Sequence, residues 1–148
     1  MTEDQTLITE IGNTMWRVFP AEFKKLIFEA TIYEEWPMHA YYLLDENNQK
    51  CGYVRQDPPD REMDKVMNLC KQLVQTPVFV DKPFNHVKVV LDDDRTIGLN
   101  FADIPRGDSW VGLFMRGVSQ LSEKEAKQYH IPKDEWERRV RKFRRRDT

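Results

Sequence analysis

The first apolar positions of the chain recur at the spacing of an amphipathic helix. One helical stripe collects Leu7, Ile8, Ile11, Met15 and Trp16. Proline cannot continue a helix and disfavours helical backbone in the residue before it, so Pro20 predicts that the helix ends near Val18. We expect residues 21–25 to form a turn or a short linker helix.

Residues 26–44 are rich in strand-forming side chains. These are Ile27, Phe28, Thr31, Ile32, Tyr33, Tyr41 and Tyr42. Pro37 interrupts the run, and a proline within a sheet loses a ladder hydrogen bond, so we place a turn at residues 34–37 between two antiparallel strands. A second turn is predicted at residues 45–49, and a short third strand at 51–55.

Asp-Pro-Pro-Asp at residues 57–60 predicts the start of a central helix. Asp57 is suited to cap it, and prolines are tolerated in a first turn, where the missing N–H groups would lack partners. One face carries Met63, Val66, Met67, Cys70, Leu73 and Val74. We expect this helix to end near Gln75, before Pro77.

The second half of the chain begins with a hairpin pattern. Apolar residues alternate at Val87, Val89, Leu91 and again at Ile97, Leu99, Phe101, on both sides of a turn at residues 92–95. Ser122 and Glu125 form a capping box for a short helix stopped by Pro132. A last helix is predicted at residues 134–145, within a basic segment at about 133–146. Between the hairpin and the helices, we expect the apolar residues Trp110 and 113–115 to be buried in a hydrophobic core.

This order of elements predicts an α+β fold. Helix, three strands, helix, two strands and helices, joined by short connections, favour an antiparallel sheet of about five strands with helices packed on one face. The length of 148 residues suits a single domain spanning 1–148, and no second core is expected.

The charge is distributed unevenly along the chain. From Lys133 onward there are eight Lys and Arg against four Asp and Glu, so this segment carries +4 and residues 1–132 carry −6. An acidic body favours basic partners and repels nucleic acid. The acidic start of the chain and the lack of a long apolar run predict no membrane span and a cytoplasmic location. Cys51 and Cys70 are expected to be buried, unpaired thiols.

Candidate catalytic residues are few. The sequence has no phosphate-binding loop, no zinc-protease helix and no GxSxG motif, and its three histidines are widely separated, so we predict no enzyme, cofactor or metal site. Cys70 with His86 could form a nucleophile and base, but Cys70 falls on the apolar helix face, where burial suppresses the thiolate. The triplet Asp92, Asp93 and Asp94 fits a solvated turn, an acidic patch facing a partner, or a cation site.

Two further features allow alternatives. The basic stretch at residues 138–146 fits a solvated helix end, because cations are favourable near a helix C-terminus, but it could also contact nucleic acid. Trp36, in a predicted turn, and Trp110 could be core residues. If either is exposed, it becomes an anchor for a protein interface.

Several segments resemble the YezG-like family of bacterial immunity proteins. They are an amphipathic helix running into Val-Phe-Pro-Ala-Glu-Phe-Lys-Lys at 18–25, a tyrosine-bearing strand at Tyr41 and Tyr42, the strand–turn–strand at 87–101 followed by Asp103, and Lys-Gln-Tyr-His-Ile-Pro at 127–132. The resemblance implies a protein that neutralises a toxin, commonly a nuclease, by direct binding in the cytoplasm of the producing cell.

The sequence therefore predicts an immunity protein that binds a cognate toxin with a basic surface, with a nucleic-acid-binding regulator as the alternative. An acidic inhibitor would be steered toward a cationic cleft. We expect the partner-binding residues to be acids and aromatics in exposed turns. They are Glu34, Glu35, Trp36, Asp57, Asp60, Asp92, Asp93, Asp94, Asp103, Asp108 and Trp110.

Overall fold

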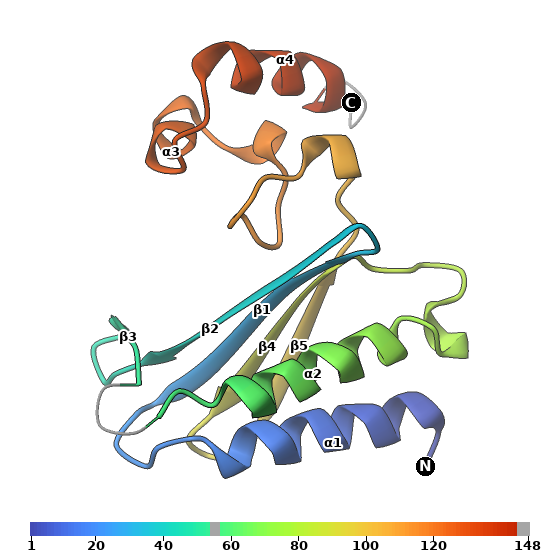
Figure 1. Cartoon of the computed structure of the whole chain (residues 1–148), viewed down its shortest axis with the longest axis vertical. Coiled ribbons are helices and arrows are strands. Elements are labelled where there is room, and N and C mark those ends of the chain that lie inside the picture. The colour runs from blue at the N-terminus through green and yellow to red at the C-terminus, as the bar shows by residue number, and fades with distance from the viewer. Residues whose placement is uncertain (54–56, 145–148) are drawn as a thin grey trace.

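The chain forms an antiparallel sheet with two long helices on one face and a small helical lobe beyond one end (Figure 1). The computed structural model describes residues 1–53 and 57–144. The sheet has five strands in the order β3-β2-β1-β4-β5, and every neighbouring pair is antiparallel. The strands are β1 (Lys25–Tyr33), β2 (Trp36–Leu44), β3 (Lys50–Cys51), β4 (His86–Asp92) and β5 (Ile97–Ala102). The predicted α+β fold is confirmed.

Helices α1 (Glu3–Arg17) and α2 (Asp60–Leu73) cover one face of the sheet (Figure 1). Their apolar stripes pack on the alternate strand residues that point to that face, as periods of about 3.6 and 2 residues require. The buried cluster includes Ile11, Met15, Leu26, Phe28, Met63, Val66, Leu73, Val87 and Val89. We call this sheet with α1 and α2 the sheet body.

The start of α2 differs from the prediction. Asp57 does not cap the helix, because the N-cap position is Pro59 and no side chain caps it. The first helical hydrogen bond runs from the Met63 N–H to the Pro59 carbonyl (2.9 Å), so both prolines precede the helix. Proline keeps its carbonyl acceptor and has no N–H to satisfy, which makes it acceptable there.

The turn between β1 and β2 is shorter than predicted. Tyr33 pairs with Trp36 and Ile32 with Pro37, which leaves Glu34 and Glu35 as the turn. Pro37 is tolerated in β2 because β3 pairs only with Leu43 and Leu44 at the far end of the strand. The predicted third strand is shortened to Lys50–Cys51, and residues 54 and 55 of that prediction lie outside the described residues.

Residues 106–144 form what we call the C-terminal lobe (Figure 1). Besides the short turn η1 (Pro77–Phe79) in the sheet body, the remaining elements are η2 (Arg106–Asp108), η3 (Val118–Gln120), α3 (Glu123–Gln128) and α4 (Lys133–Phe143). The Ser122–Glu125 capping box begins α3 as predicted. The lobe buries a second cluster: Leu113, Val118, Leu121, Ala126 and Ile131, with Trp110 and Trp136 against it. The expectation that no second core would form is therefore wrong.

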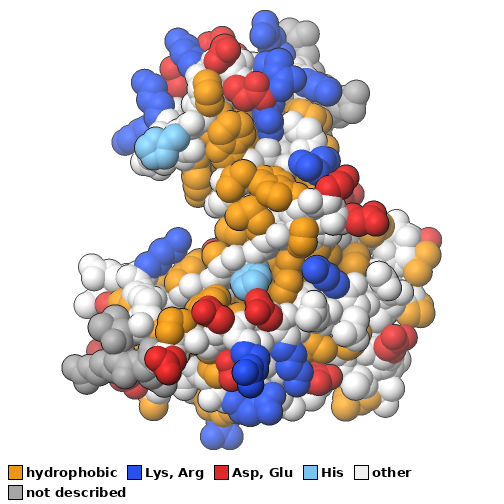
Figure 2. Space-filling view, in the orientation of Figure 1, with side chains coloured by type: hydrophobic (Ala, Val, Ile, Leu, Met, Phe, Trp, Pro, Cys, Tyr) orange, Lys and Arg blue, Asp and Glu red, His pale blue; other side chains and the backbone are white. Residues whose placement is uncertain are grey.

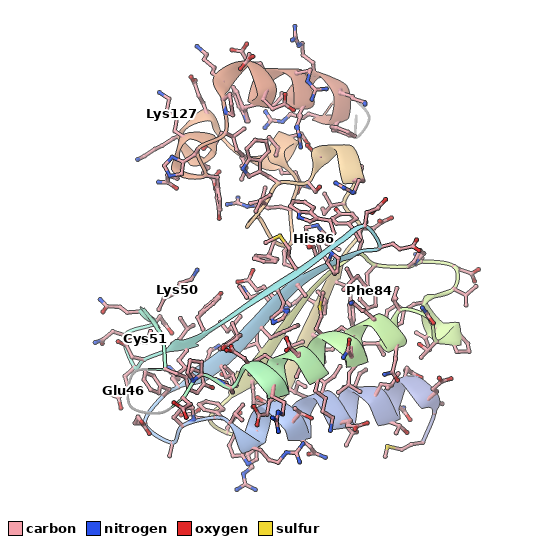
Figure 3. The ribbon with its side chains drawn as sticks, viewed as in Figure 1. Glu46, Lys50, Cys51, Phe84, His86 and Lys127 are labelled. Carbon is pink, nitrogen blue, oxygen red and sulfur yellow. The ribbon has the colours of Figure 1, made fainter. Side chains whose placement is uncertain are left out.

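Figure 2 shows a hollow between the C-terminal lobe and the sheet body, with hydrophobic side chains gathered where the two join. Lys50 in β3 and Lys127 in α3 lie on opposite sides of this hollow (Figure 3). Across residues 1–53 and 57–144, none of the helices has the length and apolar character that a membrane span requires.

A buried histidine joins the C-terminal lobe to the sheet. His86, the first residue of β4, is fully buried, and its Nδ1 accepts the N–H of Met115 (2.7 Å). Nε2 lies 3.1 Å from the Tyr33 hydroxyl, which donates to the Ile104 carbonyl (2.7 Å). Because Nδ1 accepts and the Tyr33 proton is already used, the imidazole must be neutral with its proton on Nε2.

Burial lowers the pKa of His86 from 6.5 to about 4. A proton on Nδ1 would place an N–H group against the Met115 N–H and break the hydrogen bond between His86 and the C-terminal lobe. The stabilisation is complete above the ordinary pKa near 6.5 and is lost as the pH falls toward 4, because the unfolded chain then binds the proton more readily.

We expect the free energy of unfolding to fall by about 2 kcal/mol between pH 7 and pH 5 through this residue alone. Urea unfolding at the two pH values measures the change. In His86→Asn the side-chain oxygen can still accept from Met115 but does not titrate, so its pH dependence should be smaller by that amount. Equal pH dependence in the two proteins would contradict the assignment.

Candidate protein-binding site

A pocket lies where the β1–β2 turn meets the C-terminal lobe. Its volume is about 290 Å³, and its lining is Trp36, Arg106, Ser109, Trp110, Val111 and Arg139. We call it the Trp36–Trp110 pocket. The first lining residue comes from the start of β2, the next four from η2 and the loop after it, and the last from α4. The pocket therefore exists only when the hydrogen bonds of His86 hold the C-terminal lobe in place on the sheet body.

Arg106 forms one wall of the pocket. Its guanidinium lies over the Trp36 ring (5.3 Å) and the Tyr33 ring (5.6 Å). Its Nε is also 3.4 Å from a carboxylate oxygen of Glu35 in the β1–β2 turn. Stacking on two rings and pairing with one carboxylate restrict the rotamers of the arginine, so it is presented in a fixed orientation.

Arg139 forms the opposite wall. Its guanidinium lies over the Trp110 ring (5.4 Å), and its Nη1 donates to the Ser109 carbonyl. Nε donates to Glu135 one helical turn earlier (2.6 Å). The α4 helix thereby holds the loop that carries Trp110, although the two segments are about thirty residues apart in sequence.

The residue types of this pocket are those of an interaction surface. Trp and Arg dominate the binding energy of protein interfaces, since they combine a large apolar area with directed polar groups. Trp36 and Trp110 are half-buried, which fixes their rings while one side stays open. Val111 is 58% exposed and extends the apolar surface beside Trp110. A partner side chain could bury itself between the two indoles.

The Tyr33 hydroxyl lies behind the pocket and does not supply a charge. Burial is the main cause that raises its pKa to about 12, and the nearby carboxylates of Asp103 and Asp108 act in the same direction. Asp103 is exposed and accepts a hydrogen bond from the Asn85 amide (2.9 Å). The neutral hydroxyl acts as a hydrogen-bond bridge between His86 in the sheet and Ile104, just before the C-terminal lobe begins.

Asp108 was predicted to contact a partner, and this prediction is wrong. Its residue is only 3% exposed, and its carboxylate accepts the Ser119 N–H (2.9 Å) and the Ser119 hydroxyl (2.6 Å). The carboxylate ties η2 to η3 inside the C-terminal lobe. A buried charge with several hydrogen bonds is a structural element, because exposing it would cost those bonds.

The other predicted acids do not form one surface. Asp92 pairs with Lys25 (3.3 Å), and Asp94 accepts from the Thr96 hydroxyl, which lowers the pKa of Asp94. Asp93 is exposed in the same turn. This turn pairs with the start of β1 and so lies at the opposite end of the sheet from Glu34 and Glu35.

Asp57 and Asp60 lie before and at the start of α2, in a segment separate from both turns. Both are exposed, and Asp60 accepts a hydrogen bond from the Tyr41 hydroxyl. The structure therefore brings Trp36 and Trp110 together in one pocket, with Glu35 paired to its Arg106 wall. Glu34 lies in the same turn but lines a different pocket, with Tyr33 and Lys71, and the remaining predicted acids lie elsewhere.

The basic residues of α4 serve mainly to hold the C-terminal lobe together. Arg138 and Arg139 both pair with Glu135. Arg144 donates to the carbonyls of Ser119 and Leu121, with distances from 2.6 to 3.1 Å. These bonds hold the guanidinium groups of Arg139 and Arg144 against neighbouring segments of the lobe, while Arg138, Arg141, Lys142 and Arg144 all remain exposed to solvent. Residues 145 and 146 of the predicted basic segment lie outside the described residues.

The groups considered for catalysis are held in other roles. Burial raises the pKa of the Cys70 thiol to about 12, so it is protonated at neutral pH. Both ring nitrogens of His86 are occupied by Met115 and Tyr33. Within the part of the chain that the structure describes, no cluster of three or more His, Cys, Asp or Glu is placed to hold a metal ion.

The two arginines of the pocket were not predicted as binding residues. Arg106 stands in a loop without a periodic pattern, and Arg139 was interpreted only as part of the basic stretch. Neither has a local signal, because their role arises from contacts with Trp36 and Trp110, which lie far from them in sequence.

No protein-family model matches this sequence, and no curated protein sequence matches it either.

The C-terminal lobe, and with it half of the pocket, should depend on Gly117. A Cβ atom at this position would lie 2.1 Å from an Asp108 carboxylate oxygen and 3.1 Å from the Asp108 backbone oxygen. We expect Gly117→Ala to displace Asp108 from Ser119 and to lower the free energy of unfolding by about 2–4 kcal/mol. Urea unfolding followed by tryptophan fluorescence measures the change. Gly52→Ala is the control, since nothing lies within 4 Å of its Cβ; equal stability of the two variants would refute the expectation.

Proposed function

We propose that this chain is a non-catalytic protein-binding domain that uses the Trp36–Trp110 pocket to hold a partner protein. The observation that carries the proposal is the convergence of two half-buried tryptophans and two oriented arginines in one pocket of about 290 Å³. Such a set suits an interface hot spot, where a few preoriented aromatic and Arg side chains provide most of the affinity.

The partner class that we propose is a bacterial toxin, neutralised by direct binding. This rests on the sequence resemblance to YezG-like immunity proteins and on the −6 charge of residues 1–132. An inhibitor needs shape, charge and a few buried anchors, and it needs no chemistry of its own. Long-range attraction would come from the acidic charge of the whole body, since the predicted acids do not form a single patch.

The pocket also restricts what the partner must present there. Two guanidinium groups flank the indoles: Glu35 pairs with Arg106, and Glu135 pairs with Arg139 but is shared with Arg138, so these three arginines face two carboxylates. An aromatic or aliphatic side chain next to a carboxylate would satisfy both the apolar floor and the arginines. We therefore expect a toxin whose overall surface is basic to insert a locally acidic segment into the pocket.

Co-expression tests this function directly. Each reading frame adjoining the gene of this chain is expressed in a laboratory bacterium, with and without the chain. We expect one frame to be toxic alone and tolerated with the chain, and the two purified proteins to form a stable complex. If the chain protects against none of the toxic frames, the immunity function is wrong.

Single substitutions then test the pocket. Trp36→Ala and Trp110→Ala should each weaken the complex with that toxin about 10- to 100-fold, measured by calorimetry, because each removes a buried anchor. Trp16→Ala is a matched control: Trp16 is also half-buried beneath an arginine, Arg95 (4.9 Å), but lies on α1 away from the pocket. Equal affinity of the pocket variants and the control would remove the pocket from the interface.

A further inference from the structure

Among the residues that the structure describes, no strand lies beside the outer edge of β5. β5 is the last strand of the sheet on the side opposite β3 (Figure 1). Its residues Ile97, Gly98, Leu99, Asn100, Phe101 and Ala102 include no charge and no proline. Folded proteins usually protect such an edge with charges, prolines or very short strands, because free N–H and C=O groups invite another strand. The opposite edge of the sheet is protected in this way, because Pro37 lies in β2 and the two-residue strand β3 covers the end of β2.

The hydrogen bonds of the hairpin show which groups of β5 point outward. The Asp92 N–H donates to the Thr96 carbonyl (3.0 Å), which closes the turn. Bonded pairs alternate along an antiparallel ladder, so Gly98 and Asn100 are the next residues that bond to β4. The N–H and C=O groups of Ile97, Leu99 and Phe101 are thereby directed away from β4.

The side chains along this edge are apolar on the face covered by the helices. Ile97 and Leu99 are partly buried there, and Phe101 is 37% exposed. Phe101 contacts Phe79 with ring centroids 5.0 Å apart, and the neighbours of Phe79, Val78 and Val80, are 61% and 68% exposed. An apolar surface therefore lies next to the free backbone groups.

We propose that this edge pairs with β5 of a second copy of the chain. The two strands would run antiparallel about a two-fold axis at Leu99. Leu99 then faces Leu99 of the second copy, and Ile97 faces the second copy's Phe101. Ile97, Leu99 and Phe101 are the residues whose backbone N–H and C=O groups point outward. The hydrogen-bonded pairs between the two copies would therefore use the backbone groups that do not bond to β4.

Charge complementarity supports a second copy as the occupant. In the register centred on Leu99, Arg95 of one chain faces Asp103 of the other, once at each end of the strand pair. Both residues are exposed. In the single chain Arg95 lies over the Trp16 ring (4.9 Å) and Asp103 accepts a hydrogen bond from the Asn85 amide (2.9 Å), so the pair forms when these side chains turn toward the second copy. A shift by one residue would set outward groups against inward ones and reverse the faces. A shift by two would place Arg95 opposite an apolar residue or beyond the strand, so the strand is complementary to itself in one register only.

The resulting dimer would have one continuous sheet containing the five strands of each copy. The Trp36–Trp110 pocket is at the β1–β2 turn and takes no part in the edge, so the dimer is independent of the proposed function.

The mass of the full chain in solution tests the dimer. Light scattering on a size-exclusion column should give twice 17.7 kDa at micromolar concentrations. Leu99→Lys would place two lysines together on the axis and should raise the dissociation constant at least about 100-fold. Ala40→Lys is the control and should stay dimeric, because it introduces the same charge in β2, near the opposite edge of the sheet. Circular dichroism confirms that both variants are folded.

A charge exchange tests the register. Arg95→Asp and Asp103→Arg should each weaken the dimer about 10-fold through like-charge contacts, and the double variant should recover most of the loss. Amide exchange gives a second readout: the N–H groups of Ile97, Leu99 and Phe101 should become protected on dimerisation, whereas Gly98 and Asn100 are protected in both states.

Three results would overturn the proposal. They are a monomeric wild-type protein at every concentration, a dimer unaffected by Leu99→Lys, and a dimer whose protected amides lie outside β5. A failure of the double charge variant to regain affinity would show that the strands pair in a different register, and the assigned pairing would then be wrong.

Discussion

The C-terminal lobe is held to the sheet by an imidazole that must remain uncharged. His86 accepts a backbone N–H from the lobe on one side and meets the Tyr33 hydroxyl on the other, and Tyr33 in turn bonds to Ile104, just before the lobe begins. A lysine or a carboxylate could not replace it at neutral pH, because a charged lysine only donates hydrogen bonds and an ionised carboxylate only accepts them. The geometry of everything above the sheet, including the pocket, follows from this contact.

Electrostatics in this protein work largely within the molecule. Arg144 binds carbonyls of the C-terminal lobe, Arg139 fixes the loop of Trp110, and Asp108 joins η2 to η3. In the sequence these side chains resemble a basic tail and a surface acid, but in the structure they form hydrogen bonds that hold the C-terminal lobe together. A lobe with a core of a few residues needs them, since its apolar burial alone is small.

The period of the apolar residues was sufficient to predict α1, α2 and the β4–β5 hairpin. Each of these three elements has one face packed in the core that they share and one face toward water, so its apolar residues recur regularly. Prediction from the sequence failed where the outcome depended on neighbours distant in sequence. Pro37 argued for a turn, yet it lies in a strand whose outer side is open. The acid Asp108 argued for a surface, yet a partner eleven residues away holds it inside. Trp36 and Trp110 were identified as possible anchors, whereas their arginine neighbours could be found only from the structure.

The bonds made by Arg144 have a consequence for the order of folding during synthesis. All strands of the sheet body end by Ala102 and are synthesised before this residue, so that part can fold first as a unit. The C-terminal lobe cannot complete its hydrogen bonds until Arg144 has been added. Before that, the carbonyls of Ser119 and Leu121 lack this donor. Until Arg144 has been added and the lobe has folded, the nascent chain therefore presents a sheet on which Trp36 lacks the opposite wall of its pocket.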